Sequence, residues 1–215
     1  MNPQIDAFVF DMDGTLLDTL PDLVDVTNDT MEHFGYPTHT SDEILRMVGN
    51  GLRSLITQAM PQGLEKEAAD ACIAYWKALY DERGDVKTQV YAGMMDVLHT
   101  LKAQGKKLAV LSNKYDAGTK LMTNHYFADV MDMAMGEGPV PRKPDPTGLL
   151  RVAEELAVPI ERVAYVGDSH TDVEAAQRAG AFAVAVTWGY QPRERLEAAR
   201  PDAWAESPAD LLSLA

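Results

Sequence analysis

The sequence of 215 residues contains a single cysteine, Cys72. One thiol excludes an internal disulfide framework and a cysteine-rich metal site, and its simplest interpretation is a small residue on a packed helix. No apolar run is long enough to span a membrane. Residues 1–5 also lack the basic stretch, followed by an apolar one, with which a signal or transit peptide begins. These absences lead us to expect a cytoplasmic protein.

Basic residues are scarce as well. The chain has 19 Lys and Arg against 33 Asp and Glu, which gives a net charge of −14. Such a surface repels nucleic acid and anionic membranes, so we expect neither as a partner. It would also repel a phosphorylated substrate, and any phosphate site must therefore carry its own local positive charge. The remaining composition is that of an ordinary folded protein, and no internal repeat or low-complexity linker interrupts it.

Short, continuously apolar runs recur along the chain at residues 7–10, 107–112, 162–167 and 182–186, with a less regular one at 130–135. Runs of this length and composition are typical of strands buried on both faces of a parallel sheet. Helical patterns alternate with them. The alternation predicts an α/β fold with a doubly wound, mostly parallel sheet. The helices of this part are expected at residues 93–104, 116–126, 145–157, 171–180 and from 207 onward.

Helix starts carry their own signals. Asp145 is a plausible N-cap with Pro146 at the first helical position. Residues 171–174 and residues 40–43 both have the spacing of a capping box, in which a Ser or Thr precedes an acidic residue by three positions. Gly180 is a typical helix stop.

Residues 17–87 break the alternation, because only helical patterns occur there, at 20–34, 41–47, 51–60 and 64–83. We interpret this block as an all-helical cap domain inserted after the first strand. The predicted organisation is thus a catalytic α/β core of residues 1–16 and 88–215, with a helical cap of residues 17–87.

The first candidate site follows the first predicted strand. Asp11 stands at its carboxyl end, where open α/β sheets place their ligands, and Asp13 lies two residues further on. Gly14 permits a sharp turn before Thr15. Paired carboxylates at such a place suit nucleophilic catalysis, acid–base catalysis or metal binding. A solvated acidic turn is the plainer alternative, whereas a calcium-binding EF-hand loop is excluded because Leu16 occupies the position that requires glycine.

A second acidic group follows a later strand. Asp168 comes directly after residues 162–167, and Asp172 begins a helix at the same predicted edge of the sheet as Asp11. Oxygen ligands of this kind favour magnesium over softer metals. Asp172 can also serve as an acidic partner of the helix dipole. We expect His170, between them, to be an exposed loop residue rather than a ligand.

Candidate phosphate ligands complete the set. Ser112 ends a predicted strand and is followed by Asn113 and Lys114; a hydroxyl and free backbone amides there can hold a phosphate. Lys143 precedes Pro144, which restricts it to an extended conformation and so keeps the lysine on a stiff loop. Each of these signals is weak by itself.

The order of these motifs along the whole chain resembles that of the haloacid dehalogenase superfamily. The resemblance implies the Rossmann-like fold of that superfamily with an inserted helical cap, and a phosphatase that requires Mg²⁺. It implies that Asp11 is the nucleophile and Asp13 the general acid and base, and that the metal ligands are Asp11, Asp13 and Asp168. Phosphate or substrate binding is expected of Ser112, Asn113, Lys143, Gly14, Asn50, Gly51 and Arg53, with Thr15 and Asp172 in support.

Within the superfamily, residues 18–23, 48–51, 166–169 and 187–190 are most similar to bacterial phosphoglycolate phosphatases. A small phosphorylated metabolite is therefore the expected partner, bound by a monomer or homodimer. Arg53 and Lys114 are the competing cations for a substrate carboxylate. Phosphatases acting on sugar phosphates, pyrophosphate or nucleotides remain alternatives, as does a β-phosphoglucomutase.

A rival from another class is a signalling receiver domain, which also accepts a phosphoryl group on an Asp at a strand end. Receivers have no helical insertion, and their acceptor Asp lies in the middle of the chain rather than at position 11. Steady release of phosphate from a monoester would exclude this alternative.

Overall fold

The computed structural model describes residues 4–215, and these fold into two compact units. One unit comprises the chain up to Leu17 and from Val90 onward, and the other comprises Asp18–Gln89. These boundaries differ from the predicted ones by one and two residues. The reason is that two short strands, β2 (Leu17–Asp18) and β3 (Gln89–Val90), carry the chain from one unit to the other and pair with each other.

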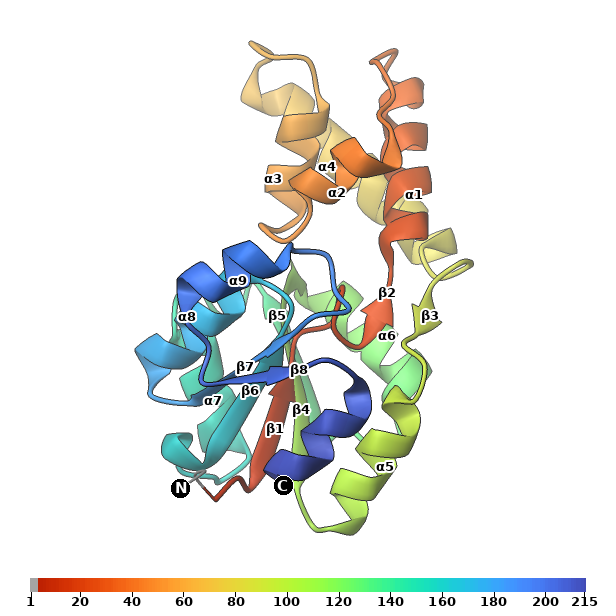
Figure 1. The fold of residues 1–215 in the computed structure, drawn as a ribbon. Helices are drawn as coiled ribbons and strands as arrows, with labels where there is room; N and C mark the ends of the chain where they lie inside the picture. Colours follow the sequence, from red (N-terminus) through yellow and green to blue (C-terminus); the bar gives the residue numbers. More distant parts are fainter. Residues whose placement is uncertain (1–3) are drawn as a thin grey trace. The chain divides into compact units, whose positions relative to one another are not determined.

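The first unit is built on a six-stranded sheet in the order β5-β4-β1-β6-β7-β8 (Figure 1). Every pairing in it is parallel. The doubly wound α/β prediction is confirmed. The strands are β1 (Ala7–Phe10), β4 (Lys107–Tyr115), β5 (Met133–Glu137), β6 (Val163–Gly167), β7 (Phe182–Val186) and β8 (Ala203–Ala205).

Two strands depart from the prediction. β5 begins at Met133 rather than at residue 130, because Val130 is buried in the turn after the preceding helix and so extends the apolar run beyond the strand. β8 was not predicted at all. It has three residues, of which only Ala205 is buried, and an apolar run of this length is too short to indicate a strand.

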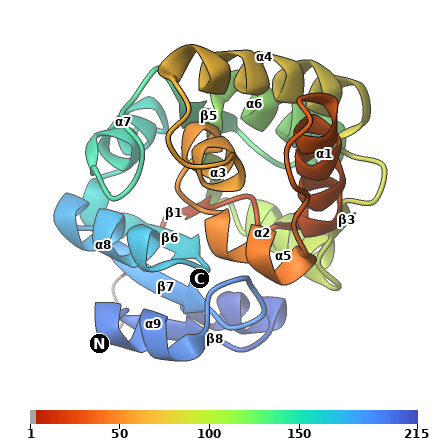
Figure 2. The same ribbon diagram turned by 90° about the horizontal axis from the view of Figure 1, so that it is seen from above.

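The second unit consists of four helices, α1 (Leu20–His33), α2 (Ser41–Met47), α3 (Leu52–Ala59) and α4 (Lys66–Arg83). α3 contacts α2 and α4, and α1 contacts the same two helices, so the four close into a bundle (Figure 2). The buried Trp76 lies in its interior, where its indole nitrogen donates to the Thr27 hydroxyl at 3.1 Å. The predicted capping box of Thr40 and Glu43 is present at the start of α2.

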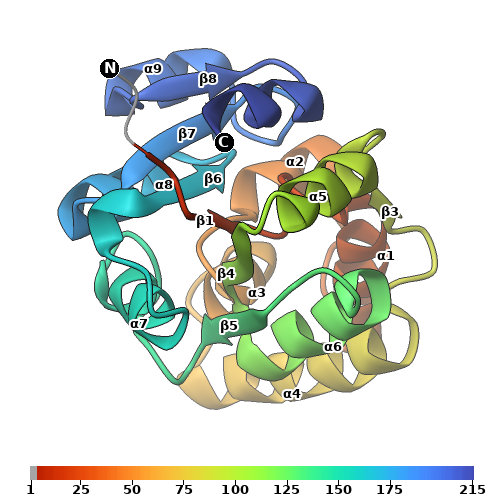
Figure 3. The same ribbon diagram turned by 90° about the horizontal axis from the view of Figure 1, so that it is seen from below.

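The sheet of the first unit is covered on both faces (Figure 3). Phe8 and Phe10 of β1 face the core shared with α5, α6 and η2, while Ala7 and Val9 face the core shared with α7, α8 and α9. The alternation follows from the period of two along a strand. These elements are α5 (Met94–Ala103), α6 (Asp116–Phe127), α7 (Thr147–Glu155), η1 (Ile160–Arg162), α8 (His170–Ala179), α9 (Arg193–Ala199) and η2 (Pro208–Leu214).

Two helix starts differ from the prediction. α8 begins at His170, and its capping box joins Ser169 to Asp172 instead of residues 171 and 174, because Ser169 has the extended backbone of an N-cap. α7 begins at Thr147, with Asp145 accepting a hydrogen bond from the Thr147 amide at 2.9 Å. The predicted stop at Gly180 is confirmed.

Short polar helices escaped the prediction. α9 has one buried residue, Leu196, and therefore no apolar periodicity to detect. Among the described residues 4–215, no helix is both long and apolar enough to cross a membrane.

Candidate active site

The carboxyl ends of three adjacent strands bring the predicted residues together. β1 lies between β4 and β6 in the sheet. Asp11 follows β1, Asp168 follows β6, and Ser112 lies in the last part of β4, where the pairing with β5 is irregular. Parallel strands end at one edge, so side chains far apart in the sequence become neighbours.

Asp11 is held through one oxygen only. Its Oδ1 accepts hydrogen bonds from the Met12 amide at 2.7 Å and lies 2.9 Å from the Lys143 ammonium. No hydrogen-bond donor among residues 4–215 reaches Oδ2. Burial raises the pKa of Asp11 to about 6 against the opposing effect of Lys143, and the neighbouring charge of Asp172 adds to the increase. The carboxylate thus has one oriented oxygen and one that is open to reaction.

Lys143 supplies the positive charge beside Asp11. Its ammonium also lies 2.7 Å from Asp172 and donates to the Leu111 carbonyl at 3.3 Å, and its side chain is only 3% exposed. The face of the buried Tyr165 ring lies 5.4 Å away. Burial by itself would lower the pKa of Lys143, but Asp11 and Asp172 more than offset that effect and raise it. Lys143 therefore stays charged.

Asn113 fixes the backbone of that lysine. Its side-chain oxygen accepts from the Lys143 amide at 2.7 Å, and its side-chain nitrogen donates to the Lys143 carbonyl at 3.2 Å. On the other side of the loop, Arg178 of α8 donates to the Pro144 carbonyl at 3.1 Å. The Asn113 side chain, which we predicted among the phosphate ligands, is thus engaged in orienting Lys143.

Asp13 forms an ion pair with Lys114. The ammonium lies 3.1 and 3.4 Å from the two carboxylate oxygens, with 4% of the lysine side chain and 16% of the aspartate side chain exposed. The Lys114 backbone is itself held, because its amide donates to the Ser112 hydroxyl and its carbonyl accepts from Thr119, both at 3.2 Å. Lys114 is one of the two cations expected to compete for a substrate carboxylate, and here it contacts Asp13, the acid–base candidate.

Asp168 receives a hydrogen bond on each oxygen. The Thr15 hydroxyl donates to Oδ1 at 3.2 Å, and the Tyr190 amide donates to Oδ2 at 2.7 Å. Burial, together with the charges of Asp11 and Asp172, raises the pKa of Asp168 to about 8 in spite of these two donors. A buried carboxylate with such a pKa lacks positive charge in its surroundings.

Gly14 is required by its conformation and by its neighbours. Its φ of +84° lies in the left-handed region, and a Cβ at this position would overlap the carboxylate of Asp168 and come within 2.9 Å of the Tyr190 ring. The turn after Asp11 therefore brings the backbone directly against Asp168.

Asp172 joins α8 to the charged cluster. One oxygen accepts from the Ser169 amide at 2.9 Å and from its hydroxyl at 2.6 Å, and the other contacts Lys143 and the Tyr165 hydroxyl. Its expected place at the start of the helix is confirmed. His170 differs from the expectation of an exposed loop residue: it is the first residue of α8, and its Nδ1 lies 3.0 Å from the Gln191 side chain.

Three carboxylates, Asp11, Asp168 and Asp172, have oxygens within 4.8 Å of one another. When all three carboxylates are ionised, Lys143 balances one of their charges and two negative charges remain, which matches a divalent cation. Oxygen donors alone are the ligand set that magnesium prefers. This cluster contains two of the predicted metal ligands, Asp11 and Asp168, together with Asp172, while the Asp13 side chain is paired with Lys114.

The remaining candidates belong to the helical unit. Gly51 is the N-cap of α3 with a φ of +79°, Asn50 precedes it, and Arg53 lies in the first turn of the helix. The Arg53 guanidinium pairs with Asp70 of α4 at 2.5 Å, and both side chains are about half exposed. A part of Asn50, Gly51 and Arg53 in binding substrate stays a prediction.

Sequence reasoning missed several partners in the site. Tyr165 donates to the Leu111 carbonyl at 2.8 Å and contacts Asp172, and the Tyr190 amide holds Asp168. Backbone groups have no sequence signal. Tyr165 had one, since it is a residue with a polar tip in the middle of an otherwise apolar strand.

Comparison with known proteins links these features to one family. The sequence profile described as haloacid dehalogenase-like hydrolase matches residues 8–186. A phosphoglycolate phosphatase of Vibrio vulnificus is 32% identical over 98% of this chain and 96% of its own. Phosphoglycolate phosphatase 1 of Pseudomonas aeruginosa is 30% identical over 96% of this chain and 78% of its own. A crystal structure described as a predicted phosphoglycolate phosphatase of Haemophilus somnus superposes with a TM-score of 0.91, at 26% identity and 98% coverage of both chains.

Proposed function

The chain belongs to the haloacid dehalogenase-like hydrolase family, and on this premise we propose that it is a magnesium-dependent phosphatase in which Asp11 attacks phosphorus. The coarser assignment, a phosphoric monoester hydrolase, follows from the family and from its full-length relatives. The finer assignments are the metal, the covalent intermediate and the substrate.

The geometry of Asp11 carries the proposal. A carboxylate nucleophile needs one oxygen free to approach phosphorus and the other held in place, which is the arrangement of Asp11 Oδ2 and Oδ1. Attack on a phosphate monoester forms an aspartyl phosphate as the bond from phosphorus to the leaving oxygen breaks. Water then attacks this intermediate at phosphorus, which releases inorganic phosphate and restores the carboxylate.

Charge explains why the nucleophile needs help. A carboxylate that approaches a dianionic phosphate meets two unit repulsions, each of about 4 kcal/mol at 4 Å with an effective dielectric of 20. Lys143 lies 2.9 Å from Asp11 and offsets part of this repulsion. A magnesium ion held by Asp11, Asp168 and Asp172 would supply two further positive charges next to the transferred phosphoryl group.

Asp13 is the proposed acid and base. In its protonated form it would donate a proton to the leaving alkoxide, and in its ionised form it would accept one from the attacking water. Lys114 keeps both carboxylate oxygens of Asp13 in one place. Ser112 is the proposed phosphate ligand, although in this structure its hydroxyl accepts from the Lys114 amide.

We propose 2-phosphoglycolate as the substrate, which the enzyme would convert to glycolate and phosphate. The names of the relatives that match this chain over nearly its full length support this choice. A cytoplasmic location and a small phosphorylated metabolite as partner belong to the same proposal.

The test is a comparison of kcat/KM for phosphate release from phosphoglycolate, a sugar phosphate, a nucleotide, pyrophosphate and p-nitrophenyl phosphate. We expect phosphoglycolate to give the highest value, and no release by Asp11→Asn on any of them. A sugar phosphate that is isomerised without release of phosphate would indicate a mutase. A phosphorylated protein without turnover would indicate a receiver.

A further inference from the structure

The segment after β7, residues 187–191, holds two groups that meet at Asp168. Trp188 is partly buried against the core of the sheet unit, and its indole nitrogen donates to the Thr15 carbonyl at 3.1 Å. Two residues later, the Tyr190 amide donates to Asp168. The function proposed above assigns no role to this segment.

The two oxygens of Asp168 depend on two different stretches of chain. Oδ1 is held by the Thr15 hydroxyl, from the turn after β1, and Oδ2 by the Tyr190 amide, from the segment after β7. Trp188 joins these stretches through a side-chain hydrogen bond, because it stands in one and donates to the other. Its hydrogen bond therefore fixes the spacing between the two donors that hold the carboxylate.

Both stretches of backbone pack closely against Asp168. A Cβ at Gly189 would overlap the Cβ of Asp168, and a Cβ at Gly14 would overlap its carboxylate. The two glycines thus bring both stretches of backbone against Asp168 from different parts of the chain. A shift of either stretch would move a donor away from its oxygen.

We infer that Trp188 is a positioning residue for Asp168, which it holds in the orientation that a divalent cation bound with Asp11 and Asp172 requires. The inference rests on the magnesium site of the proposed function. Magnesium demands nearly ideal octahedral geometry, so a carboxylate free to rotate binds it less well than one already oriented. Groups that orient metal ligands typically change metal affinity by about 10–100-fold when they are lost.

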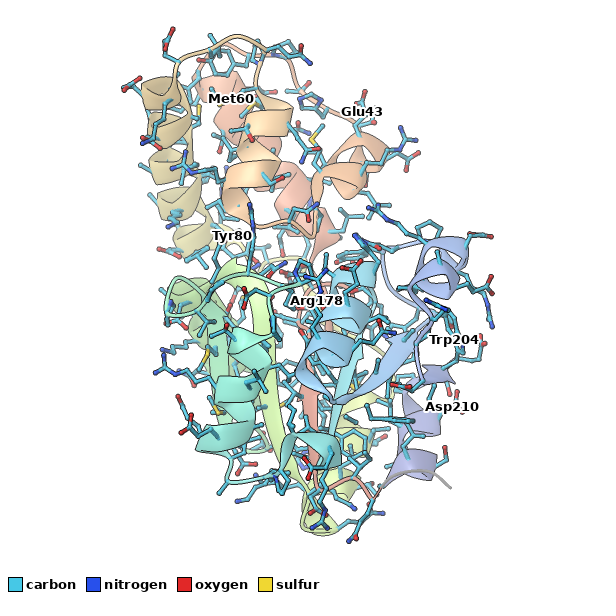
Figure 4. The ribbon with its side chains drawn as sticks, turned by 90° about the vertical axis from the view of Figure 1, so that its left-hand side faces the viewer. Glu43, Met60, Tyr80, Arg178, Trp204 and Asp210 are labelled. Carbon is cyan, nitrogen blue, oxygen red and sulfur yellow. The ribbon has the colours of Figure 1, made fainter. Side chains whose placement is uncertain are left out.

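The test is the dissociation constant for Mg²⁺, measured by titration calorimetry on the full chain without substrate. Trp188→Phe keeps the aromatic packing and removes the indole N–H. We expect its dissociation constant for Mg²⁺ to rise about tenfold. Trp204→Phe is the control, because Trp204 (Figure 4) lies in β8, where the Arg193 guanidinium is 4.6 Å from its ring.

A role in packing alone would give a different result. Trp188→Phe would then lower the melting temperature with no change in magnesium affinity, and this outcome would overturn the inference. Should Trp188→Phe not fold, replacement of the indole by benzothiophene, which exchanges N–H for sulfur, removes the same donor with little change of shape.

The same substitution in an Asp168→Ala variant distinguishes a failure of this inference from a failure of the proposed function. In Asp168→Ala, magnesium affinity should fall steeply, and Trp188→Phe should cause no further loss there. Unchanged binding by Asp168→Ala would refute the metal site and this inference with it. Weakened binding by Asp168→Ala together with normal binding by Trp188→Phe would refute the inference alone.

Discussion

Each of the two units contains a buried aspartate: Asp22 lies near the start of α1, and Asp11 follows the end of β1. The hydrogen-bond donors around the two carboxylates differ. Asp22, in α1 of the helical unit, accepts hydrogen bonds from the amides of Lys87 and Thr88 and from the Thr88 hydroxyl, at 2.7–3.1 Å. Asp11, in the sheet unit, has donors from residues 4–215 on one oxygen only. The comparison teaches that burial of a carboxylate does not identify a reactive site, whereas an oxygen without a donor does.

The largest effect should come from substitution of these two aspartates. Asp11→Asn is expected to abolish turnover while the protein still folds, because an amide is a poor nucleophile and the change removes a charge from an acidic cluster. Asp22→Asn should do the reverse. It replaces an acceptor by an NH₂ group facing N–H donors, which should lower the free energy of unfolding by about 1–3 kcal/mol and leave kcat/KM near its normal value.

Activity assays and denaturant unfolding of both variants measure these changes. Residual activity of Asp11→Asn within tenfold of the wild type would end the assignment of the nucleophile. Loss of activity in folded Asp22→Asn would show that the contrast between the two aspartates is wrong.

Magnesium should stabilise the sheet unit more as the pH rises. Without metal, the pKa is about 8 for Asp168 and about 6 for Asp11, against about 4 for an unfolded aspartate. Each group therefore takes up a proton on folding between pH 4 and its folded pKa, so stability falls as the pH rises through that interval. Magnesium competes with these protons and restores stability at the upper end.

The measurement is the melting temperature at pH 6 and pH 8, with and without saturating Mg²⁺. We expect the increase caused by Mg²⁺ to be larger at pH 8. In Asp168→Asn, which carries no titrating group at this position, the dependence on pH should be reduced. An equal increase at both pH values in the wild type would contradict the charge balance proposed for the cluster.

Loss of the Lys114 ammonium should impair Asp13. Lys114→Met is expected to lower kcat/KM by about 100-fold, the lower end of the range for general acid–base catalysis, on ethyl phosphate and p-nitrophenyl phosphate, which have no carboxylate. The same change in an Asp13→Asn background should cost little more. Lys120→Met is a suitable control, because Lys120 also pairs with an aspartate but is half exposed. A loss confined to phosphoglycolate would instead show that Lys114 reads the substrate carboxylate.

The smallest effect is expected in the helical unit. Arg53→Ala should lower kcat/KM for phosphoglycolate by about 1.5 kcal/mol, the lower end for a hydrogen bond to a charged group, since its guanidinium is already shared with Asp70. It should leave p-nitrophenyl phosphate nearly unchanged. Asp70→Ala, which frees Arg53, is the matched control. Equal losses on both substrates in both variants would mean that the ion pair only stabilises the helices.

The sequence predicted the parts of the site that depend on strand ends. Asp11, Ser112 and Asp168 could be brought together because buried parallel strands are recognisable and end at one edge. Their partners could not be predicted. One donor to Asp168 is a backbone amide, and the indole of Trp188 donates to a backbone carbonyl; neither backbone group has a sequence signal. The ammonium of Lys114 could have turned to substrate or to Asp13, and the sequence does not distinguish the two. β8 and α9 escaped because they bury too few side chains to leave a pattern.

The most direct test of the central claim is to trap the intermediate on Asp11. Wild-type enzyme turning over a phosphate monoester would be quenched with borohydride, which reduces an aspartyl phosphate to homoserine, and its peptides analysed by mass spectrometry. We predict homoserine at position 11, dependent on Mg²⁺ and absent when substrate is omitted. Sustained phosphate release with no modification at position 11, or with homoserine at Asp13 or Asp168 instead, would contradict the account.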